Sequence, residues 1–83
     1  MLLTELVKLN QNSDMTIPER IKYLRKQSKL TQKDVADEIG VKQNHYHYIE
    51  TGFFDPKTIE VVKMAKLFNV SIDYLLTGKE FKK

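Results

Sequence analysis

Basic side chains gather in one stretch of the chain, where they could attract a negatively charged ligand. Between Glu19 and Lys33 there are six basic residues and one acidic residue, which gives a local charge of +5. Charge of this sign attracts an acidic polymer such as a nucleic acid. The alternative is an ordinary solvated helix face, because exposed lysines need no partner. The basic residues are Arg20, Lys22, Arg25, Lys26, Lys29 and Lys33. The run by itself leaves both interpretations open.

A second candidate for chemistry is the run His45-Tyr46-His47-Tyr48, because two histidines invite a metal ion. On a helix, residues two positions apart point about 200° away from each other. The chain has no cysteine and no third histidine to complete a tetrahedral site, so we expect no metal and no other cofactor. Catalysis has no candidate either, since there is neither a glycine-rich phosphate loop nor a nucleophile with a base at helical spacing. The sequence predicts binding and not an enzyme.

Composition limits these residues to one small helical domain. The 83 residues contain no cysteine, so apolar packing must stabilise the fold without disulfides. The net charge is +3, and no apolar run approaches the roughly 20 residues that span a bilayer. Three glycines and two prolines are few for an all-β protein, which needs frequent turn residues. We therefore expect an all-α protein. The first residues do not resemble a secretory signal, so we expect the protein in the cytoplasm, away from membranes.

Capping residues and apolar spacing predict five helices after a short N-terminal extension. They are expected over 17–28, from Thr31 to Gly40, over 42–51, over 57–68 and from Ser71 to Gly78, with Asn69 as a left-handed cap between the last two. Residues 1–15 are expected to form a partly ordered arm with an apolar stripe. Residues 16–78 form the helical domain, and 79–83 form a charged tail.

Two of these helices meet at a tight turn. The helix that ends at Gly40 is followed almost at once by the helix over 42–51, which is the arrangement of a helix-turn-helix unit. In such a unit the second helix lies in the DNA major groove and the first crosses the backbone. The spacing alone is a weak signal, because many helical bundles contain such a pair.

The residues around this turn strengthen the signal. The stretch 30–41 (LTQKDVADEIGV), followed by 48–52 (YIETG) and later by Asp55-Pro56, resembles the lambda-repressor-like helix-turn-helix family, also called the Cro/CI or Xre type. The resemblance extends through 64–76 and covers about residues 17–78. It implies a compact five-helix domain that binds operator DNA as a dimer on a two-fold symmetric site and regulates transcription.

The resemblance also implies roles for individual residues. The exposed face of the family's recognition helix is matched by Lys42, Gln43, Asn44, His47 and Tyr48. Gln43 and Asn44 suit base contacts best, because a planar amide both donates to and accepts from adenine, and His47 and Tyr48 would assist them. Lys42 replaces the family's usual serine, which exchanges a helix cap for a positive charge. Contacts to DNA phosphates are expected from Gln32, Lys33, Lys42, Lys57 and Lys29.

Other matched positions concern packing. Arg25 and Glu50 occupy two positions that form an ion pair in many members of the family, which ties the first helix to the third. Tyr46 replaces the usual aliphatic core residue, so its ring is expected inside with the hydroxyl at a polar edge. Phe53 and Phe54 stand where relatives carry basic or polar residues in a loop along the DNA. We expect one of these rings to be buried and the other exposed.

Together these inferences predict a small, sequence-specific regulator of transcription, most simply a repressor, that binds double-stranded DNA. The helix over 42–51 enters the major groove of a two-fold symmetric operator. A homodimer is expected to form through the last helix and the tail, 74–81, with the N-terminal arm as second choice. The alternative is a protein-interaction module or antitoxin with the same fold, which docks on a protein partner through Phe53 and Phe54 or through the arm.

Overall fold

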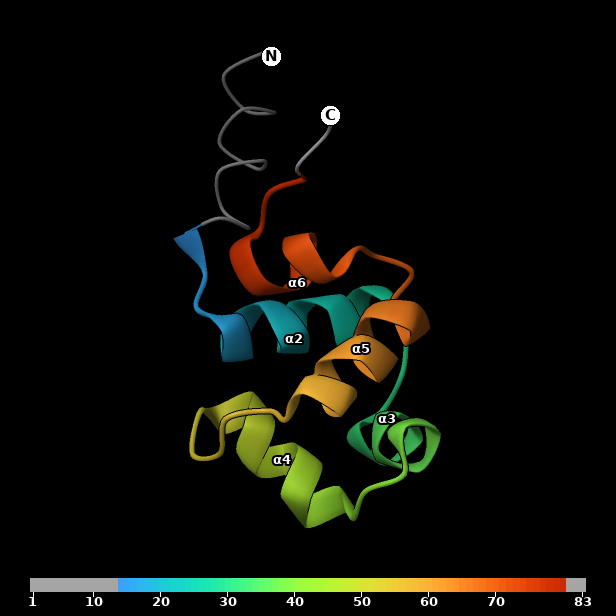
Figure 1. Cartoon of the computed structure of the whole chain (residues 1–83). Helices are drawn as coiled ribbons and strands as arrows, with labels where there is room; N and C mark the ends of the chain where they lie inside the picture. The colour runs from blue at the N-terminus through green and yellow to red at the C-terminus, as the bar shows by residue number, and fades with distance from the viewer. Residues whose placement is uncertain (1–13, 81–83) are drawn as a thin grey trace.

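Five α-helices make up the computed structural model, which describes residues 14–80 (Figure 1). They are α2 (Ile17–Gln27), α3 (Gln32–Ile39), α4 (Gln43–Thr51), α5 (Thr58–Leu67) and α6 (Ile72–Thr77). Every helix begins and ends within one residue of the predicted positions, so the all-α, five-helix prediction is confirmed. No helix in this part of the chain is long and apolar enough to cross a membrane. Most of the predicted arm over 1–15, and the last three residues of the tail, lie outside the described residues.

Capping interactions fix where the helices begin and end. The Thr16 hydroxyl accepts the Glu19 N–H at 3.3 Å, and the Thr16 N–H donates to the Glu19 carboxylate at 2.9 Å. Thr31 and Asp34 repeat this capping box before α3, at 3.0 and 2.9 Å. Gly40 ends α3 with φ at +78°, in the left-handed region that a residue with a Cβ avoids. The turn to α4 therefore needs only residues 40–42.

Within residues 14–80, two residues other than glycine adopt the same left-handed conformation. Asn69 has φ at +59° after α5, as the sequence predicts. Lys29 has the same φ after α2, which the sequence does not predict, because a lysine side chain has no amide to favour this region. The Leu30 N–H donates to the Arg25 carbonyl at 3.2 Å and closes the turn. The hydrogen bond that closes the end of α2 therefore sets the left-handed conformation of Lys29, and not an intrinsic preference of lysine for that region.

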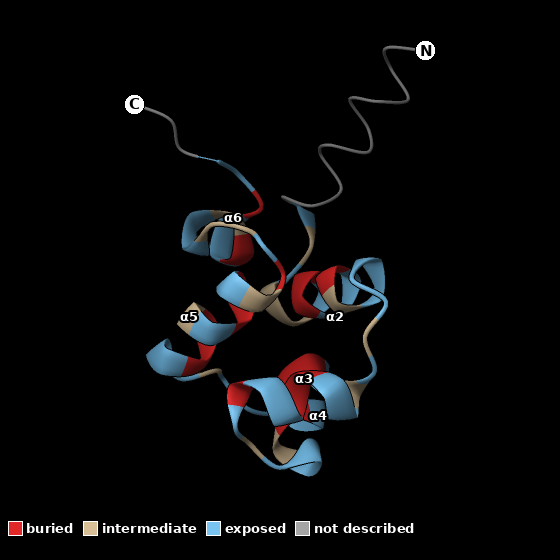
Figure 2. Ribbon diagram, turned by 90° about the vertical axis from the view of Figure 1, so that its right-hand side faces the viewer, coloured by how far each residue is buried: buried red, intermediate tan, exposed pale blue. Residues whose placement is uncertain are grey.

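The apolar faces of the helices meet in one core. α3 packs on α4 and α5, α2 packs on α4 and α6, and α5 packs on α6. Figure 2 shows the buried residues on the sides of the helices that face the interior. The core consists of Ile21, Leu24, Val35, Ala36, Ile39, Tyr46, Ile49, Val61, Met64, Ala65, Phe68 and Leu75. Tyr46 is fully buried, as predicted.

Arg20 is buried although it belongs to the basic run, so it is not among the residues of that run that could attract DNA. It exposes only 2% of its surface. Its guanidinium donates to the Leu75 carbonyl at 2.9 Å and to the Met15 carbonyl at 2.7 Å. Arg20 thus joins α2 to α6 and to the segment before α2, where its charge serves the fold.

Candidate nucleic-acid interface

The outer face of α4 carries a row of polar and aromatic side chains. Gln43, Asn44, His47 and Tyr48 are all exposed, and Tyr48 keeps 41% of its surface open. Their spacing along the helix places them on one side, opposite the buried Ile49. The four residues that the sequence analysis singles out for base contacts therefore share one accessible surface.

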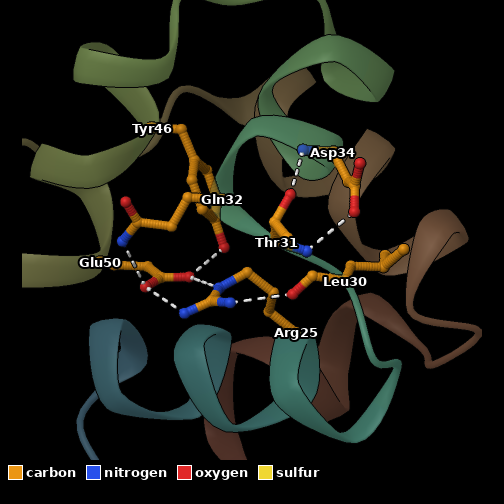
Figure 3. Close-up of polar contacts among 7 residues, drawn as sticks. All are labelled: Arg25, Leu30, Thr31, Gln32, Asp34, Tyr46 and Glu50. Carbon is orange, nitrogen blue, oxygen red and sulfur yellow. Dashed lines mark hydrogen bonds and ion pairs between the residues drawn. The ribbon is translucent and has the colours of Figure 1, made fainter.

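Glu50 fastens this helix to its neighbours from the inner side (Figure 3). Its carboxylate accepts hydrogen bonds from Arg25 Nε at 2.6 Å, from Arg25 Nη2 at 3.3 Å and from Gln32 Nε2 at 3.0 Å. The Tyr46 hydroxyl also donates to it, and Arg25 Nη1 donates to the Leu30 carbonyl at 2.9 Å. The ion pair implied for Arg25 and Glu50 is thus present, at the centre of a network that joins α2, α3 and α4.

The charges of this network follow from its burial and its hydrogen bonds. Burial alone would raise the pKa of Glu50, but hydrogen bonds from Arg25, Tyr46 and Gln32 outweigh burial and lower that pKa. The hydrogen bond to Glu50 raises the pKa of Arg25. Burial, reinforced by the Glu50 carboxylate, raises the pKa of Tyr46. The carboxylate therefore stays charged at neutral pH while the phenol stays protonated and donates to it.

Gln32 serves this network, a role that the sequence analysis missed. Its side chain is half-buried and uses one amide hydrogen on Glu50. A phosphate contact would have to use the other amide hydrogen or the backbone N–H in the first turn of α3. Contact between Gln32 and DNA stays a prediction. Fewer hydrogen-bond donors of Gln32 are available for it, because one amide hydrogen is used on Glu50.

The lysines predicted to contact phosphates lie on both sides of the molecule and not in one cluster. Lys29 belongs to the connection between α2 and α3, and Lys57 ends the loop between α4 and α5; these segments lie at the right and left of Figure 1. Lys42 is the N-cap of α4 and makes no side-chain cap, as its substitution for serine predicts. Lys33 forms an exposed ion pair with Asp37 at 2.9 Å. All four lysines are exposed.

The prediction that one of the rings of Phe53 and Phe54 is buried is wrong, because both are exposed. Phe53 exposes 74% of its surface and Phe54 exposes 38%. The chain reverses at Gly52, and the N–H groups of Phe53 and Phe54 both donate to the Tyr48 carbonyl, at 2.9 and 3.1 Å. These bonds hold both residues over the end of α4 instead of letting one ring turn into the core.

His45 joins α4 to α5, which the sequence analysis also missed. Its Nε2 lies 2.9 Å from the buried Glu60 carboxylate. The other Glu60 oxygen accepts the Lys57 N–H at 2.8 Å, where α5 begins. The partners are 15 residues apart, so no helical spacing reveals the contact. Among residues 14–80, no group of three or more histidine and acidic side chains could hold a metal ion.

Known proteins share the sequence pattern of this domain. The model of the Helix-turn-helix family (HTH_3) matches residues 21–75. The HTH-type transcriptional regulator ImmR of Bacillus subtilis (strain 168) is 35% identical over 69 residues, which cover 83% of this chain and 54% of ImmR. The cryptic phage CTXphi transcriptional repressor RstR of Vibrio cholerae is 39% identical over 61 residues, which cover 74% of this chain and 55% of RstR. The chain spans about half the length of these relatives.

A solved structure shares the fold. The P22 c2 repressor, crystallised in complex with a synthetic operator, superposes with a TM-score of 0.73 and 28% sequence identity. The superposition covers 78% of this chain and 98% of that chain. The sequence and structural matches confirm the resemblance, and the chain belongs to the helix-turn-helix family of the Cro/CI and Xre type.

Proposed function

We propose that this chain binds double-stranded DNA in a sequence-specific way and regulates transcription, with α4 in the major groove. The observation that carries the proposal is the single exposed face formed by Gln43, Asn44, His47 and Tyr48. ImmR is named a transcriptional regulator and RstR a transcriptional repressor, and the P22 c2 repressor is bound to an operator. Repression is the sign of regulation that this comparison favours. The activity is binding, and no turnover is proposed.

The network around Glu50 supports the proposal by making α4 rigid. Arg25 comes from α2 and Gln32 from α3, while Tyr46 and Glu50 belong to α4 itself. A rotation of α4 against α2 or α3 would break hydrogen bonds to a buried carboxylate, which is costly. The exposed face therefore keeps its orientation before DNA arrives, and little affinity is lost to ordering it.

Gln43 and Asn44 stand in the first turn of α4, the part of a recognition helix that reaches base edges. A planar amide pairs with adenine by donating to N7 and accepting from the N6 amino group. We expect adenine at the operator positions that these two residues contact. Lys42, immediately before them, would meet a phosphate where the DNA backbone passes the start of the helix.

The exposed lysines supply the attraction that does not depend on sequence. Lys29 lies in the connection before α3, Lys33 in α3 and Lys57 in the loop before α5. We propose that these three segments meet phosphates on different sides of the groove. Lysine contacts of this kind release counterions, and the affinity therefore falls as salt rises. Gln32 would add one contact from the start of α3.

A homodimer is the proposed form on DNA. Ile72 and Leu76 expose 42% and 38% of their surfaces and lie one turn apart on α6. Figures 1 and 2 both place α6 at the end of the molecule away from α3 and α4. A second copy at α6 would leave the face of α4 open, and two-fold symmetry would set the recognition helices about 34 Å apart. The N-terminal arm is the second candidate for this contact.

The alternative function, a protein-interaction module or antitoxin, would use Phe53 and Phe54 or the N-terminal arm. The names of the relatives do not favour it. A cytoplasmic location follows from the proposed function, because the DNA that it regulates lies there.

A binding selection tests the proposal. The chain is incubated with a random pool of duplexes, the retained duplexes are sequenced, and fluorescence anisotropy compares the selected site with a scrambled one across a salt series. We expect the selected site to bind at least about 1,000-fold more tightly, and both affinities to fall linearly in a log–log plot against salt. An interaction module would show no preferred sequence.

A further inference from the structure

Exposed aromatic rings extend the proposed base-contacting face beyond the end of α4. Tyr48 belongs to that face, and its ring centroid lies 5.3 Å from the ring of Phe53 and 5.2 Å from the ring of Phe54. The two phenylalanine rings lie 5.4 Å apart. We call Tyr48, Phe53 and Phe54 the aromatic cluster. Since Tyr48 belongs to both sets of residues, the cluster is continuous with the proposed DNA surface.

The aromatic cluster is held in place before any ligand binds. Gly52 adopts a φ of +84°, which turns the chain back so that Phe53 and Phe54 can both donate to the Tyr48 carbonyl. The ring centroids of Phe54 and His45 also lie 5.4 Å apart. His45 in turn contacts the Glu60 carboxylate on α5. Contact with a ligand therefore costs little conformational entropy, although Phe53 leaves most of its surface in water.

The chemistry of these rings selects one group on DNA. Asp55 is the only charged residue between Gly52 and Lys57, and its carboxylate repels phosphates. In the major groove, base edges present polar donors and acceptors together with one apolar group, the C5-methyl of thymine. We propose that the aromatic cluster contacts thymine methyl groups, with Phe53 as a specificity-determining residue. This inference rests on the proposed function, and it adds thymine to the adenine expected opposite the amides of α4.

The test replaces thymine by deoxyuridine, which removes the methyl group and leaves every hydrogen-bonding group of the base in place. Affinities of the full chain are measured for the selected operator and for duplexes with one thymine changed at a time. We expect wild type to lose about fourfold in affinity per contacted methyl, the factor that corresponds to about 0.8 kcal/mol for a buried group of that size. Thymines outside the contact should show no effect.

Two variants locate the effect at the cluster. Phe53→Ala should bind the thymine operator as weakly as wild type binds the uracil duplex, with no further loss on uracil. Tyr23→Ala removes another exposed aromatic ring, from α2, and should behave as wild type. Because Phe53 is 74% exposed, its truncation should leave the thermal unfolding temperature almost unchanged, which separates lost contact from lost fold.

Three results would overturn the inference. Phe53→Ala could bind both duplexes as wild type does, which would assign the cluster to another ligand such as a protein partner. The uracil loss could persist undiminished in Phe53→Ala, which would place methyl recognition elsewhere on the protein. Wild type could prefer no duplex at all, and that result alone would remove the proposed function together with this inference.

Discussion

The Glu50 carboxylate on α4 lies 2.6 Å from the Arg25 guanidinium on α2, with 2% and 11% of the two side chains exposed. Water is thus largely excluded from both charges. Such a pair need not add much net stability, but removing one partner leaves the other buried and unpaired. Both the stability of the domain and the orientation of α4 against α2 should therefore depend on keeping the two residues together.

Replacing Arg25 by methionine should destabilise the protein by about 3 to 5 kcal/mol, because Glu50 would lose its counter-ion while remaining buried. The double variant Arg25→Met/Glu50→Leu should lose less than the sum of the single variants. Urea denaturation of the four proteins measures the coupling. Lys33→Met breaks an exposed pair and serves as the control, with little change expected. If the loss of unfolding free energy in the double variant equalled the sum of the two single losses, Arg25 and Glu50 would not depend on each other as proposed.

The lowered pKa of Glu50 makes part of the stability dependent on pH. The folded protein holds this carboxyl below its ordinary value of 4.5, so in acid the unfolded chain binds more protons than the folded chain. The contribution of Glu50 is therefore complete above pH 4.5 and is lost as pH falls through the lower, folded-state pKa. The stability difference between wild type and Glu50→Gln should shrink on acidification below that pH. A difference that stays constant from neutral pH into this acid range would show that Glu50 does not titrate with folding.

Lys42→Ser should change stability and DNA affinity in opposite directions. Serine at this N-cap can accept a backbone N–H that the lysine leaves without a side-chain cap, which is worth about 1 kcal/mol. The lost charge should weaken binding to every duplex and reduce the slope of log affinity against log salt by about 1. Thermal unfolding and the salt series of the selected duplex provide both readouts. An unchanged slope would remove Lys42 from the phosphate contacts.

Local signals allowed most of the fold to be predicted. Capping boxes at Thr16 and Thr31, and the left-handed cap at Asn69, depend on residues a few positions apart, so the helix ends are visible in the sequence. Tyr46 was placed correctly because the resemblance assigns its position to the core.

Contacts between distant segments could not be predicted in the same way. Arg20 finds its acceptor on Leu75, 55 positions away, so nothing near it in the sequence distinguishes it from the exposed lysines of the basic run. The contact of His45 with Glu60 depends on where the chain after α4 places the start of α5. Phe53 and Phe54 stay outside because backbone hydrogen bonds fix the loop, which composition alone does not reveal.

Contact between Gln43 and the bases is tested most directly by the variant Gln43→Ala. Gln27→Ala, which removes another exposed glutamine from α2, is the matched control. We predict that Gln43→Ala loses about 1 to 3 kcal/mol on the selected operator and almost nothing on a random duplex, while Gln27→Ala binds both as wild type does. An equal loss on the operator and on random DNA would contradict base recognition by α4.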